Sequence, residues 1–256
     1  MISALTSILR FILRGTLFIG FLLLILFPVL MLVNFHRRRG TREGEIRADE
    51  IGARLSSWMV WFFGIRVRVR GTPAEAPVLI AANHISWLDI PVLHTARAMG
   101  FVSKAEVDQW PVFSYIARTG GTIFHHRGSH DSASDVANLM TQRLKQGRRV
   151  AIFPEGGIKP GHSIRVFHAR MFRAAVDAEC KVQPVMLRYM RDGRRDYDVG
   201  FREGESMLVN FMRMLAQPRV EADINFLSPI DATGQPRRIL ADSARAAVID
   251  SYKSNQ

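Results

Sequence analysis

A histidine and an aspartate stand five residues apart in the stretch "ANHISWLDIP", residues 82–91. An imidazole whose one nitrogen is held by a carboxylate can accept a proton on the other nitrogen, which is the chemistry of a general base. Five helical positions correspond to about 140° of rotation, so His84 and Asp89 can meet only if His84 lies in a turn before the helix. The structural alternative is that Ser86 and Asp89 form a helix capping box. This stretch alone leaves both interpretations open.

A second polar cluster is "GGTIFHHRGSH", residues 120–130, in which Gly121 and Arg127 flank an apolar run. A guanidinium at the end of a strand can hold a phosphate or a carboxylate through two parallel hydrogen bonds. The adjacent His125 and His126 would point to opposite faces of a strand, and no carboxylate or cysteine completes a metal-ligand spacing. We therefore expect an anion-binding arginine here and no metal site.

A third cluster, "FPEGGIKPG" at residues 153–161, presents Glu155, Gly156 and Lys159 at a Pro-Glu-Gly turn. Glycine and proline also punctuate ordinary loops, so the motif by itself is not specific. All three clusters follow an apolar run that reads as a strand. Because ligand groups gather where the strands of an open α/β sheet end, we expect the clusters to meet at one edge of the sheet.

The elements that must position these residues alternate along the chain. The predicted strands are 65–70, 77–82, 101–103, 122–125, 148–153, 182–187 and 220–226, and the predicted helices are 90–99, 110–118, 132–146, 169–179 and 206–216. We expect the 132–146 helix to start with a capping box of Ser132 and Asp135 and to stop at Gly147. Such alternation indicates the α/β class, a mixed central sheet flanked by helices. The expected organisation is an N-terminal anchor (1–64), an α/β domain (65–230) and a C-terminal helical tail (231–256).

The N-terminal region carries the hydrophobic signal of a membrane segment. Thr16 to Val33 is an uncharged 18-residue run, followed by the cationic "NFHRRRG" rather than by a cleavage site. Pro28 and the short run also allow a segment that enters the bilayer and returns. Leu55 to Ile65, rich in tryptophan and phenylalanine, is too short to span, and we interpret it as interfacial, with a buried core helix as the alternative. The denser basic cluster after the run favours a cytosolic C-terminal side.

Composition limits the partners and the chemistry. A net charge of +12 favours anionic partners, from nucleic acid and lipid headgroups to phosphorylated cofactors and acidic carrier proteins. The single cysteine, Cys180, excludes an intramolecular disulfide. No phosphate-binding glycine loop, dinucleotide fingerprint or nucleophile elbow occurs. A direct transfer assisted by a histidine base is therefore the simpler mechanism.

Taken in order, the clusters resemble the sequence blocks of the lysophospholipid acyltransferases, among them the 1-acyl-glycerol-3-phosphate acyltransferases. The resemblance runs from about residue 65 to residue 227 and includes "NHISWLD", "SKAEV", "GTIFHHR", "FPEG" and "VQPV". It implies that His84 is the general base on an acceptor hydroxyl, that Asp89 orients it, and that acyl-CoA or acyl-carrier protein is the co-substrate, with no cofactor. The residues expected to contact or shape the substrate site are Asn83, Lys104, Gly121, Arg127, Glu155, Gly156 and Lys159.

The third block departs from the family pattern. Gly157 and Ile158 stand where the family usually has threonine and arginine, and His168, Ala169 and Arg170 stand where it tends to have a lysine and a glycine. Lys159 could supply a charge, but without the two-pronged geometry of a guanidinium. We expect 1-acylglycerol-3-phosphate as acceptor, with lyso-ornithine lipid or another lysophospholipid as the alternative.

The expected partners are membrane lipids and the acyl donor, without nucleic acid, and the expected location is a bacterial inner membrane with the catalytic domain on the cytosolic side. A basic membrane-binding protein without catalysis is the rival class. It would explain the charge and the anchor, but it would leave "NHISWLD" and "FPEG" as coincidences.

Overall fold

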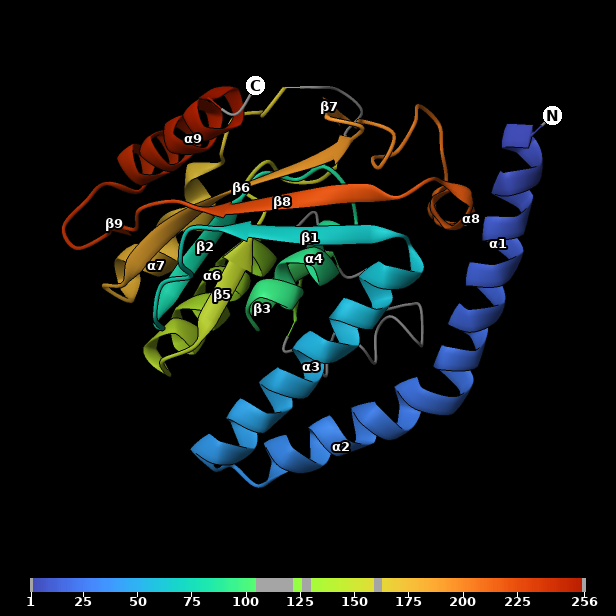
Figure 1. Cartoon of the computed structure of the whole chain (residues 1–256). Coiled ribbons are helices and arrows are strands. Elements are labelled where there is room, and N and C mark those ends of the chain that lie inside the picture. The colour runs from blue at the N-terminus through green and yellow to red at the C-terminus, as the bar shows by residue number, and fades with distance from the viewer. Residues whose placement is uncertain (1, 105–121, 126–129, 159–162, 255–256) are drawn as a thin grey trace.

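The computed structural model describes residues 2–104, 122–125, 130–158 and 163–254. A nine-stranded sheet forms its centre, with the strand order β1-β8-β6-β2-β5-β3-β4 and with β7 and β9 paired to β6 (Figure 1). The strands are β1 (Ile65–Arg70), β2 (Val78–Ala82), β3 (Gly100–Lys104), β4 (Ile123–His125), β5 (Arg149–Ile152), β6 (Lys181–Arg191), β7 (Arg194–Arg195), β8 (Val220–Phe226) and β9 (Ile230–Asp231).

The sheet is mixed, as predicted. Pairs from β6 through β2, β5 and β3 to β4 are parallel, whereas β6 and β8 are antiparallel. Two predicted strands, 65–70 and 220–226, have the observed bounds of β1 and β8, and these two strands pair in parallel. Because β2 and β5 run in the same direction, the turns after them open at the same edge of the sheet, which is the edge where the sequence clusters were expected.

Two layers of helices cover the two faces of the sheet. Along β2, Val78, Ile80 and Ala82 join one buried cluster while Leu79 and Ala81 join the other, as the alternating side-chain directions of a strand require. The first face packs against α3 (Arg42–Phe62), α4 (Asp89–Ala96) and α8 (Met207–Ala216); the second packs against α6 (His130–Lys145), α7 (Arg173–Asp177) and α9 (Arg237–Ser254).

The C-terminal region predicted as a helical tail contains α9. Leu240, Ala244 and Val248 recur every four residues on this helix and are fully buried in the second cluster. Contacts of α9 with β6 and with the short helix Ala169–Phe172 hold it against the sheet.

Two predicted helix ends can be checked directly. Helix α6 begins at His130, so Ser132 lies inside the helix and the predicted capping box is wrong. Its end is as predicted, because Gly147 has a φ of +74°, which favours glycine, and its N–H donates to the Leu144 carbonyl. The predicted helix at 110–118 lies outside the described residues.

The N-terminal helices form a bent hairpin beside the sheet (Figure 1). Helix α1 (Ile2–Phe21) continues through a π-helical turn, Leu22–Leu26, into α2 (Phe27–Arg38), and α3 then returns to β1. The continuous stretch Ala4–Arg38 is long and apolar enough to cross a membrane, with a mean hydropathy of 2.9 over its most apolar window.

The segment 55–65 has two faces, and each of the two interpretations, interfacial and core, describes one of them. Leu55, Val60 and Phe62 are buried in the core cluster, as expected of a core helix, whereas Trp58 and Trp61 are 49% and 58% exposed. The tryptophans thus lie on the outer face of α3, available to an interface.

Candidate active site

The turn between β2 and α4 brings the histidine and the aspartate together. His84 lies just after the strand end, and Asp89 is the first residue of α4. The Nδ1 atom of His84 is 2.8 Å from Oδ2 of Asp89. A carboxylate can only accept at this contact, so Nδ1 carries the hydrogen and Nε2 is the acceptor of the ring. This is the arrangement that a general base requires.

Asp89 is completely buried, and several donors fix its carboxylate. The N–H groups of Ile85 and Ser86 donate to Oδ2 over 2.7 and 3.0 Å, and the Tyr189 hydroxyl donates to Oδ1 over 2.7 Å. Only half of the alternative capping box forms: the Ser86 N–H donates to Asp89, but Leu88 is the N-cap and the Ser86 hydroxyl donates to the carbonyl of Val199. The aspartate instead holds the turn that precedes its own helix.

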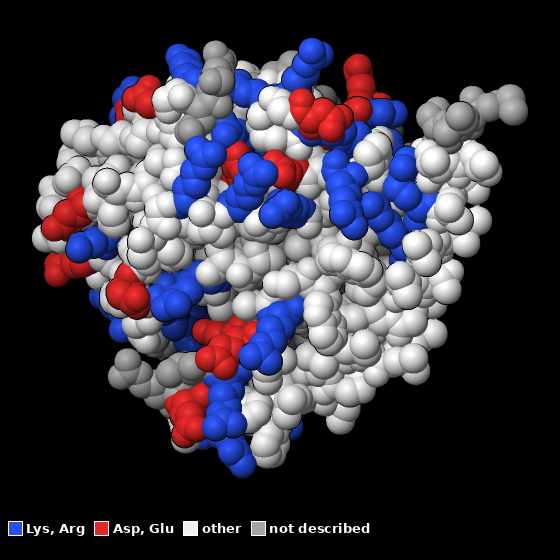
Figure 2. Space-filling view, viewed as in Figure 1, with Lys and Arg blue, Asp and Glu red and all other residues white. Residues whose placement is uncertain are grey.

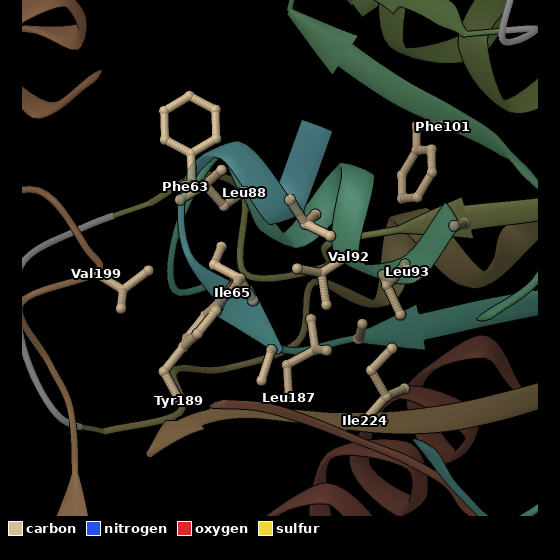
Figure 3. Packing of buried hydrophobic residues seen from close by; sticks show 14 of the residues in the cluster. Phe63, Ile65, Leu88, Val92, Leu93, Phe101, Leu187, Tyr189, Val199 and Ile224 are labelled. Atoms are coloured by element: carbon tan, nitrogen blue, oxygen red, sulfur yellow. The ribbon is translucent and has the colours of Figure 1, made fainter. Parts of the chain in front are cut away.

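Tyr189 was not identified from the sequence. It comes from β6, 100 positions after Asp89, and its ring lies in the buried cluster with Leu88 and Val92 (Figure 3). Burial, together with the negative charge of Asp89, raises the pKa of the Tyr189 hydroxyl well above its usual value. The hydroxyl therefore stays protonated and acts only as a donor to the carboxylate.

The His84 ring is also held by an aromatic side chain. It stacks on Phe153 with ring centroids 3.8 Å apart and an interplanar angle of 9°. The His84 side chain is 11% exposed, whereas Asp89 is not exposed at all. The ring thus presents a small accessible edge at the end of the sheet.

Glu155 joins the two loops at this edge. It is 4% exposed, and it accepts the backbone N–H of His84 on Oε1 and that of Arg165 on Oε2, each over 2.9 Å. The Arg165 guanidinium also contacts this carboxylate and donates to the carbonyl of Gly157. With both oxygens used in this way, Glu155 sets the position of the His84 backbone, and its expected role in shaping the substrate site stays a prediction.

Arg245 of α9 holds the other side of this loop. Its guanidinium donates to the carbonyls of Arg165 and Ile164 over 2.7 and 2.9 Å. Neither arginine was identified from the sequence: Arg165 belongs to no recognised motif, and Arg245 acts on a segment 80 positions away in the chain. A chain of hydrogen bonds therefore runs from α9 through Glu155 to the backbone of His84.

Gly156 occupies a position that suits glycine. Its φ is +77°, and a Cβ atom there would lie 3.3 Å from the ring of His168. The His168 N–H donates to the Pro154 carbonyl over 2.9 Å. His168, one of the departures from the family pattern, thus covers the turn that contains Glu155 and Gly156.

Asn83 is hydrogen-bonded within the fold, and its expected contact with substrate stays a prediction. It is 2% exposed, its amide group donates to the carbonyl of Leu187 over 2.9 Å, and its amide oxygen accepts the Leu187 N–H over 2.7 Å. Both polar ends are used, so Asn83 ties the end of β2 to β6 and supports the turn from below.

The other candidate residues lie beyond what the structure describes. Gly121, Arg127 and Lys159 are outside the described residues, and Lys104 is described only as the last backbone position of β3. Their predicted roles at the substrate stay predictions.

Comparison with known proteins shows to which family the chain belongs. A family model described as "Acyltransferase" matches residues 66–188. A lyso-ornithine lipid O-acyltransferase of Pseudomonas aeruginosa is 40% identical over 182 residues, covering 71% of this chain and 70% of the relative. The chain belongs to the acyltransferase family.

Two further relatives agree with this membership. A 1-acyl-sn-glycerol-3-phosphate acyltransferase of Neisseria gonorrhoeae is 32% identical to the acyltransferase over 194 residues, covering 70% of this chain and 74% of the relative. The crystal structure of PlsC from Thermotoga maritima, a 1-acyl-sn-glycerophosphate acyltransferase, has the same fold with a TM-score of 0.67, at 18% identity over 98% of this chain and 96% of PlsC. The predicted family and fold class are thereby confirmed.

Proposed function

We propose that this acyltransferase moves a fatty acyl group from a thioester donor to the hydroxyl of a lyso-lipid. The observation that carries the proposal is the His84–Asp89 pair, with Nε2 of His84 as the proton acceptor. Nε2 takes the proton of the acceptor hydroxyl as its oxygen attacks the thioester carbonyl. The C–O ester bond forms, the C–S bond breaks, and the proton passes to the leaving thiolate. Asp89 stabilises the imidazolium between these two transfers.

Lyso-ornithine lipid is the acceptor that we propose first. Ile158 cannot provide the phosphate-binding guanidinium that the family resemblance implies for that position, and the relative named for lyso-ornithine lipid is 40% identical. 1-Acylglycerol-3-phosphate is the second candidate, favoured by the Neisseria relative and by the predicted role of Arg127.

Purified enzyme in vesicles, given a labelled thioester donor and each acceptor in turn, tests this order. Label in ornithine lipid without label in phosphatidate supports the first candidate. Label in phosphatidate alone would replace it with the second. Comparing acyl-CoA with acyl-carrier protein in the same assay identifies the donor. His84→Ala is the control for acyl transfer itself, and undiminished transfer in that variant would contradict the mechanism.

We also propose that the N-terminal anchor enters and leaves the membrane on the side of the catalytic domain. The N-terminal half of α1 is bonded to α8 through Arg10 and Arg14, and α3 runs directly into β1. An ion pair of 3.3 Å between Arg37 and Asp49 joins α2 to the charged first half of α3. A hairpin with both ends on the domain favours a re-entrant anchor, and the cytosolic face is where the proposed donors occur.

Labelling of a cysteine introduced at Gly40, the turn of the hairpin, tests this topology. A re-entrant anchor predicts that a membrane-impermeant reagent does not reach the turn from the side opposite the domain. Labelling from that opposite side would show that the anchor spans.

A further inference from the structure

Helix α8 carries an apolar face that the rest of the fold does not use. Leu208, Val209 and Met212 are 63%, 56% and 44% exposed. Their spacing of three and four residues places them on one side of the helix. The opposite side packs against the fold, where Asn210 and Met214 are buried. Single exposed apolar residues are common in proteins, but three that share one helix face form a surface.

This face continues the outward face of α1. The two helices pack against each other, and Arg10 and Arg14 of α1 donate to the last carbonyls of α8 and to that of Gln217. These bonds satisfy backbone acceptors that a helix end leaves without partners. The adjacent part of α1 exposes five large apolar residues by more than half: Leu5, Ile8, Leu9, Ile12 and Leu13.

The same side of the molecule lacks charged side chains along the outward face of α1. In Figure 2 a continuous uncharged area covers the right and lower right of the molecule, where Figure 1 shows α1, and basic residues border it above. An apolar surface bordered by basic residues suits a bilayer with anionic headgroups.

We infer that α8 is a further membrane-contacting element, whose face of Leu208, Val209 and Met212 lies in the headgroup and upper acyl region of the bilayer beside α1. Continuity with the apolar anchor selects lipid over a protein partner as the occupant.

This contact would orient the catalytic turn. The Trp87 indole N–H donates to Oδ1 of Asn210 in α8 over 2.9 Å, and the Trp87 ring stacks on Phe211. Trp87 lies three residues after His84 in the same turn. Binding of α8 to the membrane therefore fixes the distance between this turn and the membrane surface. The lyso-lipid acceptor of the proposed function comes from that surface.

Depth measurement by site-directed labelling tests the contact without using catalysis. Cys180 is the single cysteine, and burial raises the pKa of its thiol to about 11, so a label directed to L208C, V209C or M212C meets little competition at neutral pH. The matched control is I239C on α9, an exposed apolar position at 53%. Unsubstituted protein reports any labelling of Cys180.

In vesicles of phosphatidylethanolamine and phosphatidylglycerol, we expect blue-shifted emission and quenching by spin-labelled acyl chains at the three α8 positions, and neither at residue 239. Water-like emission at all three positions in fully vesicle-bound protein would overturn the inference. A blue shift that depends on protein concentration at constant lipid would also overturn it, since a second copy would then be the occupant.

A kinetic test uses the double variant Leu208→Glu with Met212→Glu, and Ile239→Glu as control. We expect the KM for lyso-lipid in vesicles to rise about tenfold or more, with kcat toward a short-chain, freely soluble acceptor unchanged. Equal KM values for the double variant and the control would contradict the inference. If the enzyme acylates none of the proposed acceptors, the labelling result still stands, so the two proposals fail separately.

Discussion

Replacing Tyr189 by phenylalanine removes a single oxygen atom from the support of Asp89. The ring remains in the core, but Oδ1 loses the 2.7 Å hydrogen bond and, being buried, cannot replace it with water. A hydrogen bond to a charged group contributes about 1.5–3 kcal/mol, so we expect the free energy of unfolding to fall by that amount. With Asp89 held by one donor fewer, we expect kcat to fall about tenfold, equivalent to about 1.4 kcal/mol in the barrier.

The assay combines urea unfolding of the detergent-solubilised enzyme with kcat and KM for a lyso-lipid acceptor. Tyr197→Phe is the matched control, because it removes a hydroxyl that bonds to Tyr252 at a position 39% exposed; it should leave kcat unchanged and lower the free energy of unfolding less than Tyr189→Phe does. A Tyr189→Phe enzyme with the kcat and unfolding midpoint of the wild type would refute the reasoning. Lost stability with unchanged kcat would show that the hydroxyl supports the fold but is not needed to position Asp89.

Three further outcomes follow from the geometry. His84→Ala should lower kcat by about a hundredfold or more while circular dichroism shows a retained fold; a smaller loss would assign the base elsewhere. Arg245→Ala should lower kcat several-fold, and Arg245→Lys should lower it less, because the Arg245 guanidinium holds the loop at Glu155. The exposed Arg238 on α9 provides the control variant Arg238→Ala, and equal effects of the two alanine variants would contradict this role. The hydrogen bond from Arg213 lowers the pKa of Glu205 from 4.5 to about 2. The ionised Glu205 therefore stabilises the folded state by about 3 kcal/mol. This contribution is complete above pH 4.5 and is lost as the pH falls toward 2. Urea unfolding of Glu205→Gln should thus differ from wild type at neutral pH and converge with it in acid, and a pH-independent difference would refute the assignment.

The sequence predicted the local part of the site well. The strand before His84 and the helix at Asp89 both follow from short patterns of apolar residues and proline, and the turn between them then follows from geometry. The run 65–70 was predicted with the observed bounds of β1 because apolar and charged residues alternate along it, and burial decreases from Ile65 to Val69.

The parts that the sequence did not predict come from long-range contacts. Tyr189 lies beyond the predicted strand 182–187, although β6 extends to Arg191, and nothing near it in the sequence indicates that its hydroxyl meets the carboxylate at the start of α4. Arg245 reads as an ordinary surface residue of an amphipathic helix. Asn83 adjoins His84, and only the three-dimensional pairing of β2 with β6 shows that its amide is hydrogen-bonded to Leu187.

The anchor and the sheet share one hydrophobic core, and this makes the membrane a ligand for folding. Phe18 and Phe21 of α1 belong to the same buried cluster as Val185 and Ile224 of the sheet. A bilayer that binds the exposed side of the folded anchor therefore binds the native state of the whole enzyme, and such binding stabilises a protein by mass action. The melting temperature should rise with lipid concentration, and enzyme released from its membrane should lose structure as well as access to substrate.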